Sequence, residues 1–233
     1  MIEFGAIIFS RMSSKRLPGK ALTDLHGTSL LERVIHNVRK IKCLDGICLA
    51  TSTDKSDDCL ENLANSLDIN CFRGSLQNVT KRALDSAKYY GYDNIVRVCG
   101  DRPFIDLNIY ETMITNHKEN KNDLTTNIFP RTVPPGLTCE IVSTKSLEKT
   151  LLLTNNSEDL EHVTRYIYNT PNEFKIQNIN FPFNEEEINL RLVIDDETDL
   201  KRTNWILKKS IENNYELDTK KIISLTKKWI KNN

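Results

Sequence analysis

The first 120 residues alternate between short apolar runs and stretches with helical spacing of apolar positions. Apolar runs predict buried strands at 3–9, 46–51, 94–100 and, more briefly, within 69–74. Helical spacing predicts helices at 29–41, 56–68, 76–91 and 106–119. The second of these helices, SDDCLENLANSLD, carries acids in its first turn, which favours a helix start there. This alternation of strands and helices predicts a mostly parallel sheet with helices on both faces.

The rhythm changes near residue 123. Strands are predicted in DLTTNIF and LTCEIVS, on either side of the proline-rich stretch PRTVPPG (130–136). Further on, the pattern predicts helices at about 144–153, 158–169, 197–213 and 218–231, and strands in FKIQNI (174–179) and INLRLVID (188–195). Because no repeat, low-complexity tract or linker interrupts the chain, we expect one domain over 1–233 with a small lobe around 123–185.

Composition excludes several classes of protein. Among the 233 residues, 32 are Lys or Arg and 32 are Asp or Glu, so bulk charge attracts neither nucleic acid nor an acidic membrane. No apolar run approaches the roughly 18 residues of a membrane span, and Glu3 in the N-terminal segment argues against a secretory signal. Six cysteines without a CxxC pair favour free thiols. We therefore expect a cytoplasmic protein without nucleic-acid or membrane partners.

A cation-rich loop follows the first predicted strand directly. The stretch SRMSSKRLPGKAL (10–22) holds Arg11, Ser14, Arg16 and Lys20. Doubly wound sheets bind ligands beyond the carboxyl ends of their strands, which favours a phosphate site over an ordinary surface loop. The stretch matches neither a Walker A loop nor GxGxxG. Arginine and lysine side chains would therefore supply the charge that a glycine nest supplies through backbone N–H groups.

Two acidic positions also follow apolar runs. Asp101 comes after Gly100 in RVCGDRPFID (97–106), and Asp195 ends the apolar part of LRLVIDDETD (190–199). Mg²⁺ takes one or two carboxylates and completes its shell with phosphate oxygens and water, so both are candidate ligands. The alternative for Asp101 is a turn residue, which is common in Gly-Asp pairs. Spacing alone does not bring the two carboxylates together.

Five motifs in order resemble one enzyme family. They are R-x-x-S-x-R-L-P-G-K (11–20), FRGS (72–75), R-x-x-GD-x-P-x-ID (97–106), EHVT (161–164) and LRL-x-x-D (190–195). The chain resembles the cytidylyltransferases of bacterial surface polysaccharides, above all the spore-coat polysaccharide biosynthesis F type. That group is similar to the synthetases of CMP-3-deoxy-octulosonate and of CMP-sialic acids. The resemblance extends over roughly residues 3–205.

The resemblance implies a Rossmann-like, GT-A-like nucleotidyltransferase fold. It also implies attack by an acceptor oxygen on the α-phosphorus of CTP, with release of pyrophosphate. By the same resemblance, the catalytic residues that hold the triphosphate would be Arg11, Arg16 and Lys20, and those that hold Mg²⁺ would be Asp101 and Asp195. The nucleotide would also lie near Ser14, Arg73, Gly74, Ser75, Arg82 and Gly100.

The acceptor is expected to be a small anion, a 3-deoxy-2-ulosonic or nonulosonic acid. Its candidate ligands are cations of the later half: Arg102, Arg131, His162 and Arg165. Helical spacing in SEDLEHVTRYIY would place Asp159, His162 and Tyr166 on one face. Each of these side chains is alternatively a solvated surface group.

Other readings of the same sequence stay open. One is cytidylyl transfer to a phosphonate or phosphate acceptor. A second is a GT-A-type glycosyltransferase, although the D-x-D motif usual there occurs nowhere in the chain. A third is a non-catalytic nucleotide-binding module, which would be expected to lack one of the loop cations or carboxylates. A homodimer is one of the oligomeric states that the sequence allows.

Overall fold

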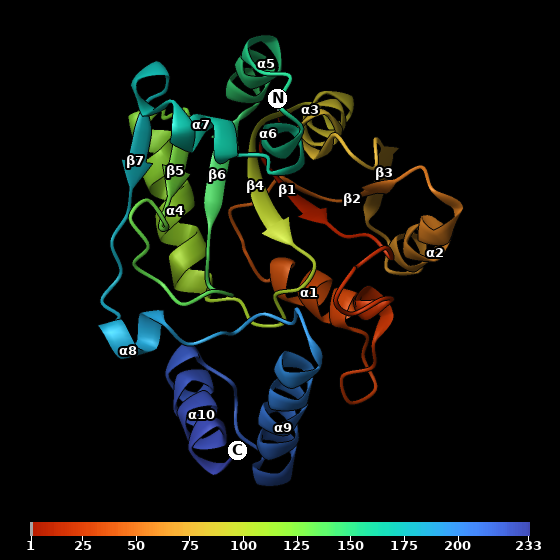
Figure 1. The fold of residues 1–233 in the computed structure, drawn as a ribbon, viewed down its shortest axis with the longest axis vertical. Helices are drawn as coiled ribbons and strands as arrows, with labels where there is room; N and C mark the ends of the chain where they lie inside the picture. The colour runs from red at the N-terminus through yellow and green to blue at the C-terminus, as the bar shows by residue number, and fades with distance from the viewer. Residues whose placement is uncertain (1) are drawn as a thin grey trace.

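The structure is a computed structural model that describes residues 2–233. One seven-stranded sheet runs through it in the order β3-β2-β1-β4-β6-β5-β7 (Figure 1). Its strands are β1 (Ile2–Phe9), β2 (Gly46–Ser52), β3 (Asn70–Gly74), β4 (Tyr92–Cys99), β5 (Leu124–Thr126), β6 (Glu140–Ser143) and β7 (Ile176–Asn178). Only β6 runs antiparallel to its neighbours β4 and β5. The predicted mostly parallel sheet is therefore confirmed.

Helices cover both faces of this sheet. They are α1 (Leu30–Val38), α2 (Asp58–Ser66), α3 (Val79–Tyr90), α4 (Leu107–Asn120), α5 (Thr144–Leu153), α6 (Ser157–Glu161), α7 (Arg165–Asn169), α8 (Glu185–Ile188), α9 (Glu197–Asn213) and α10 (Thr219–Asn232). Alternating strand residues face opposite sides, so Ala6 and Ile8 pack in the core with α1, α4, α9 and α10, whereas Ile7 packs with α3, α5 and α7. The paired helices α9 and α10 form the lower end of the molecule (Figure 1).

Local chemistry explains where several helices begin and end. Ser29 and Glu32 form a reciprocal capping box at the start of α1. The side chain of Asp106 accepts a hydrogen bond from the Ile109 N–H and caps α4. Gly91 ends α3 with φ 73°, a left-handed conformation that favours glycine. Among residues 2–233, no helix has the length and apolarity needed to cross a membrane.

Two predicted elements differ from the structure. The expected strand in INLRLVID is wrong: Leu192 and Ile194 are buried, but this segment runs across the strand ends, where its N–H groups meet the carbonyls of Pro135 and Asp101 instead of a neighbouring strand. The alternation of apolar residues therefore reflects the burial of these side chains and not hydrogen bonding to a neighbouring strand.

The expected continuous helix over 158–169 is also wrong. The chain leaves helical geometry at His162, with φ −108° and ψ 84°, and α7 starts only after Thr164. Val163 and Thr164 turn into the interior, where Thr164 donates a hydrogen bond to Glu140. This break removes the single helical face that was expected for Asp159, His162 and Tyr166.

The segment 123–185 contributes β5, β6 and β7 to the same sheet as the first half. It also contributes α5, which packs against α3. The division of the chain into one domain with a small lobe stays a prediction.

Candidate active site

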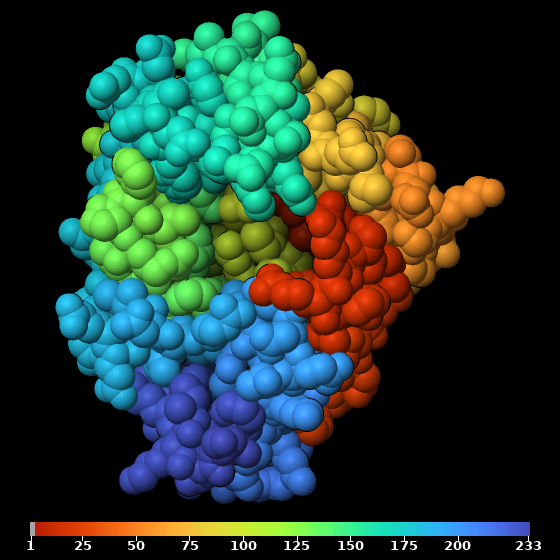
Figure 2. All heavy atoms as spheres, in the orientation of Figure 1, coloured from red at the N-terminus to blue at the C-terminus, as the bar shows by residue number. Residues whose placement is uncertain are grey.

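A cavity of about 370 Å³ opens beyond the carboxyl ends of β1 and β4. Figure 2 shows this hollow near the middle of the molecule, bordered by the red loop after β1 and the teal segment around α6. Its walls come from residues 9–21, α3, the loop after β4, the end of α6 and position 195. Segments that lie far apart in the sequence thus meet at the edge where parallel sheets bind ligands.

The cation-rich loop forms one wall of the cavity. The Met12 carbonyl accepts hydrogen bonds from the N–H groups of Ser14 and Gly19, at 2.9 and 3.2 Å, which closes the loop on itself. Gly19 has φ 74° and leads into a short 3₁₀ turn at Lys20–Leu22. Leu17 and Ala21 are buried and anchor the loop in the core. The loop side chains that line the cavity include Arg11, Ser14, Arg16 and Lys20.

Lys20 brings the two candidate metal carboxylates together. Its Nζ lies 3.0 Å from Asp101 Oδ2 and 3.1 Å from Asp195 Oδ1. The same Nζ donates to the Ile194 carbonyl at 2.8 Å. Arg16 adds a second contact to Asp195 Oδ1, at 3.2 Å. Burial alone would raise the pKa of the Asp195 carboxyl, but Lys20 and the neighbouring arginines lower it.

Each carboxylate is positioned by its surroundings. A Cβ at Gly100 would lie 2.9 Å from Ser10 Cβ, so only glycine lets β4 end this close to β1 and present Asp101 there. The Asp195 N–H donates to Asp199 Oδ2 at 3.0 Å. Asp199 is buried between Arg191 and Arg202. The segment before α9 is therefore held by a buried ion-pair network although it forms no strand.

Two of the arginines that line the cavity are Arg11, in the loop, and Arg82, in α3. Arg11 pairs with Glu161 at 3.1 Å. Arg82 is 2% exposed and donates to the Ser75 carbonyl at 2.8 Å, while its Nε has no partner among residues 2–233. Burial, together with the charge of Arg11, lowers the pKa of Arg82 to about 10. A buried guanidinium without a carboxylate partner favours an anionic ligand.

Gly74 and Ser75 contribute indirectly. A Cβ at Gly74 would lie 2.9 Å from Arg82 Cγ, so glycine there lets Arg82 pack against β3. Ser75 accepts hydrogen bonds from Arg82 and, through its hydroxyl, from the Asn78 N–H. Neither residue lines the cavity. The structure thus places both as supports of Arg82.

Arg73 lies away from the cavity. Its guanidinium donates to the Ser52 and Asp54 carbonyls and pairs with Asp58 and Glu61, at 2.5 and 3.0 Å. These local partners occupy the side chain at the sheet edge beside α2. Arg73 therefore does not line the cavity, and its expected place near the nucleotide stays a prediction.

A second group of arginines surrounds the buried carboxylate of Glu140. Arg97 forms an ion pair with Glu140, whose other oxygen accepts hydrogen bonds from Thr164 and Tyr168, each at 2.7 Å. Burial alone would raise the pKa of Glu140, but Arg97 and these hydroxyls lower it. We call Arg97, Arg102, Arg131 and Glu140 the arginine cluster.

Arg102 and Arg131 converge on one loop residue in this cluster. Arg102 is 8% exposed and donates to the Thr138 carbonyl at 2.6 Å. Arg131 donates to the Thr138 hydroxyl at 3.2 Å and to the Val133 carbonyl at 3.3 Å. Burial and the neighbouring charge of Arg102 lower the pKa of Arg131. Neither side chain lines the cavity, so the structure separates them from the cation-rich loop and the two carboxylates.

The EHVT motif divides its residues between these two regions. Glu161 pairs with Arg11, and His162 is exposed and lines the cavity. Thr164 holds Glu140. Arg165 instead pairs with Glu158 and Asp159. Arg165 therefore does not line the cavity, and its expected role as an acceptor ligand stays a prediction.

Nine of the predicted site residues line one cavity: Arg11, Ser14, Arg16, Lys20, Arg82, Gly100, Asp101, His162 and Asp195. Sequence reasoning missed Asp57, Glu161 and Asp199, which contact Met12, Arg11 and Asp195, and it missed the ion pair between Arg97 and Glu140. Arg97 and Glu161 were visible as members of the R-x-x-GD and EHVT motifs. No sequence signal marked Asp57 as more than a first-turn acid.

Two carboxylates that could hold a hard divalent cation lie at the cavity. Asp101 and Asp195 both contact the Lys20 ammonium, which also donates to the Ile194 carbonyl. Within residues 2–233, no group of three or more His, Cys, Asp and Glu side chains forms a metal site. Two carboxylates match the Mg²⁺ pattern in which phosphate oxygens and water complete the shell.

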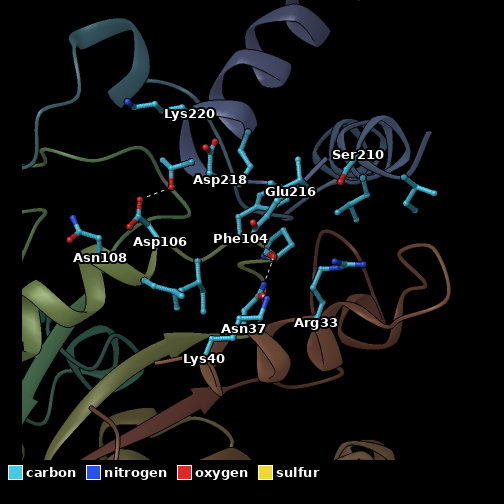
Figure 3. A pocket seen from close by; sticks show the side chains of 18 residues that line it. Arg33, Asn37, Lys40, Phe104, Asp106, Asn108, Ser210, Glu216, Asp218 and Lys220 are labelled. Atoms are coloured by element: carbon cyan, nitrogen blue, oxygen red, sulfur yellow. Dashed lines mark hydrogen bonds between the residues drawn. The ribbon is translucent and has the colours of Figure 1, made fainter. Parts of the chain in front are cut away.

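A larger cavity of about 680 Å³ lies between α1, α4, α9 and α10 (Figure 3). Its lining carries mixed charges, among them the cations Arg33 and Lys220 and the acids Asp106 and Asp218 (Figure 3). Asp106 accepts a hydrogen bond from Thr219 at 2.5 Å, so part of its polar lining is satisfied internally. It contains none of the predicted site residues, and we place the candidate active site in the smaller cavity.

Comparisons with known proteins agree with the fold and the motifs. The family described as cytidylyltransferase matches residues 5–225. The spore coat polysaccharide biosynthesis protein SpsF of Bacillus subtilis is 31% identical over 211 residues, which are 88% of this chain and 87% of that protein. The 3-deoxy-manno-octulosonate cytidylyltransferase of Parabacteroides distasonis is 28% identical over 132 residues, or 56% of this chain and 51% of that protein.

Among solved structures, a cytidylyltransferase from Leptospira borgpetersenii superposes with a TM-score of 0.86 at 29% identity. The match covers 100% of this chain and 95% of that one. The similarity thus extends over the whole fold, including the helices α9 and α10 that follow the last sheet strand.

Proposed function

This chain belongs to the cytidylyltransferase family, a family of nucleotidyltransferases that act on CTP, and from that premise we propose that it activates a small acidic sugar. An oxygen of the acceptor forms a bond to the α-phosphorus of CTP. The bond from that phosphorus to the bridging oxygen breaks, and pyrophosphate leaves with the electron pair. The acceptor class is a 3-deoxy-2-ulosonic or nonulosonic acid.

The convergence of cations and carboxylates in one cavity carries this proposal. Arg11, Arg16 and Arg82 lie with Lys20 around a space of about 370 Å³ at the carboxyl edge of the sheet. Nucleotidyl transfer depends on positioning and charge neutralisation more than on a covalent intermediate. The arginines are suited to bind the triphosphate oxygens through paired N–H groups.

Asp101 and Asp195 are the residues that would hold the divalent cation, most simply Mg²⁺. When bound, such an ion supplies charge neutralisation at phosphate oxygens. Lys20 contacts both carboxylates, so it would add a positive charge beside such an ion.

The arginine cluster supports an anionic acceptor. Three guanidinium groups lie around one carboxylate there, which leaves an excess of positive charge next to Asp101 in the chain. We assign the acceptor contacts first to Arg131, which is the most exposed of the three, and to His162, which lines the cavity. The names of the Parabacteroides and Bacillus relatives, a 3-deoxy-manno-octulosonate enzyme and a polysaccharide biosynthesis protein, support a sugar acid.

The decisive experiment is a pyrophosphate-release screen of CTP and UTP against acidic sugars, their neutral amides and phosphonates. We expect turnover with CTP and a carboxylate-bearing sugar, and a higher kcat/KM for CTP than for UTP. A base site leaves hydrogen bonds unmet when the wrong base enters. Turnover of neutral sugars with acids ignored would refute the anionic acceptor, and equal use of CTP and UTP would refute the base preference.

A phosphonate or phosphate acceptor is the second candidate. Guanidinium groups bind phosphonate oxygens through the same paired geometry as a carboxylate, so the arginine cluster fits both. The screen separates them, because a phosphonate acceptor would release pyrophosphate where every sugar acid fails.

A further inference from the structure

One backbone residue, Met12, holds several hydrogen bonds of the loop that carries the proposed phosphate-binding cations. Met12 accepts hydrogen bonds from Ser14 and Gly19 through its carbonyl, and its own N–H donates to Asp57 Oδ1 at 2.7 Å. Ser13 and Lys15 show no acceptor for their N–H groups among residues 2–233. Of the three N–H groups at Met12, Ser13 and Lys15, that of Met12 alone donates to the turn after β2.

Asp57 is an unusual partner for this bond. It occupies the N-cap position of α2, where an aspartate side chain normally accepts hydrogen bonds from the first turn of the helix. Its side chain forms no such cap bond. Instead, its second oxygen accepts from the Thr51 hydroxyl at 2.9 Å and from the N–H and hydroxyl of Ser52, at 3.1 and 2.5 Å.

The Asp57 carboxylate is 1% exposed and is held by these four hydrogen bonds without an ion pair inside the described chain. Burial alone would raise its pKa, but the hydrogen bonds from Met12, Ser52 and Thr51 lower it. A buried negative charge is costly unless the donors around it are fixed. Three of the donors belong to the end of β2, and the fourth belongs to the cation-rich loop.

We propose that Asp57 is a positioning residue that fixes the cation-rich loop, through the Met12 N–H, in the arrangement that binds the triphosphate of CTP. This role rests on the proposed function only for its effect on CTP. The Thr51 and Ser52 bonds shape the turn after β2, and the Met12 bond alone connects that turn to the loop. Asp57 contacts neither the cavity nor the reacting atoms.

The test compares Asp57→Ala with the matched control Thr51→Val. Both variants remove buried hydrogen bonds of the same carboxylate cluster, but Thr51→Val leaves the Met12–Asp57 bond intact. Limited trypsin digestion of the folded proteins reports on the loop itself, because Lys15 and Arg16 are exposed cleavage sites within it. Titration calorimetry of CTP with metal and without acceptor reports on triphosphate binding.

For Asp57→Ala we expect cleavage within residues 11–20 and the CTP Kd each to rise by roughly 10-fold, the scale of one hydrogen bond to a charged group. For Thr51→Val we expect both values to stay within about two-fold of the wild type. Loop cleavage that is equal in the two variants would overturn the proposal. Faster cleavage in Asp57→Ala with an unchanged CTP Kd would also overturn it.

If Asp57→Ala does not fold, amide hydrogen exchange of the wild-type protein tests the hydrogen bond between Met12 and Asp57. The Met12 amide should exchange at least about 10-fold more slowly than the amides of Ser13 and Lys15, because it alone has a buried acceptor. Equal exchange of the three amides would overturn the proposal. A wild-type protein that binds no CTP would refute the proposed function, while digestion and exchange would still report on the loop.

Discussion

The cavity wall that holds Arg16, Lys20, Asp101 and Asp195 differs from the arginine cluster in the surroundings of its ion pairs. In the cavity wall, Lys20 and Arg16 contact carboxylates at the surface of a cavity. In the arginine cluster, Arg97 pairs with the buried Glu140, and Arg102 donates to a backbone carbonyl away from the cavity. Because Lys20 also uses its three donors on Asp101, Asp195 and the Ile194 carbonyl, hydrogen-bond occupancy does not separate the two regions, whereas access to the cavity does.

The carboxylates of the two regions differ in the same manner. Asp101 is 26% exposed at its side chain and Asp195 is 20% exposed, whereas Glu140 is 1% exposed. An acid-to-amide substitution should therefore reduce turnover in the first region and folding stability in the second. The predictions below use this contrast, starting with the largest expected effect.

Asp101→Asn and Asp195→Asn should each lower kcat by about 1,000-fold or more, because each would remove a charge that, in the proposed function, holds the divalent cation and so stabilises the transition state. The matched control is Asp106→Asn on the same loop, because asparagine can still cap α4. It should keep near-normal turnover. Steady-state pyrophosphate release checks all three. Near-normal kcat in either of the first two variants would remove that residue from the metal site.

Glu140→Gln should lower the free energy of unfolding by about 3 kcal/mol, the lower end for removing one partner of a buried ion pair. The reason is that Arg97 would keep its charge in the interior without a counterion. Urea unfolding at neutral pH measures the difference. A variant as stable as the wild type would show that Glu140 does not neutralise the cluster.

The difference in unfolding free energy between the wild type and Glu140→Gln should depend on pH, because the pKa of Glu140 is lowered in the folded protein. The unfolded chain binds a proton near the ordinary glutamate pKa of about 4.3, and the folded protein does so only at lower pH. The ionised carboxylate therefore contributes its full stability above that value. The gap between wild type and Glu140→Gln should narrow as the pH falls below about 4. A stability difference that grows at lower pH would contradict the direction of the pKa shift of Glu140.

The sequence predicted the sheet well because burial on both faces leaves a signal in every strand. The runs at 3–9, 46–51 and 94–100 became β1, β2 and β4. The pattern failed at 188–195, where Leu192 and Ile194 are buried by crossing the strand ends. Alternation of apolar and polar residues indicates which side chains are buried, but it does not identify the groups to which the backbone is hydrogen-bonded.

The site was predictable only in part for a related reason. The position of Lys20 and Asp101 after strands is visible in the sequence, and both line the cavity. Arg73 and Arg102 have the same residue type in equally suggestive motifs, yet their guanidinium groups are bound to local acids and carbonyls. Residue type and placement can be read from the chain, whereas the partner that occupies a side chain depends on the fold.

Arg131→Ala should raise the KM of the acceptor by roughly 10–100-fold, or about 1.4–2.7 kcal/mol, and should leave the KM of CTP nearly unchanged. The side chain makes two hydrogen bonds, to Val133 and Thr138, and is more exposed than the other arginines of the cluster. Arg131→Lys is the informative partner variant, because it keeps the charge and loses the paired N–H geometry. An acceptor KM unaffected by Arg131→Ala would place the acceptor elsewhere.

Arg165→Ala should have the smallest effect, although Arg165 stands in the same motif region as His162. Its guanidinium pairs with Glu158 and Asp159, and its side chain is 37% exposed, so solvent screens both ion pairs. Asp159 keeps a hydrogen bond from Thr154 at 3.1 Å after the substitution. We expect a stability loss of at most about 1 kcal/mol and acceptor and CTP KM values within about two-fold of the wild type. A 10-fold rise in the acceptor KM alone would show that Arg165 leaves its acids to bind the acceptor. Its ion pairs with Glu158 and Asp159 would then not be evidence of a purely structural role.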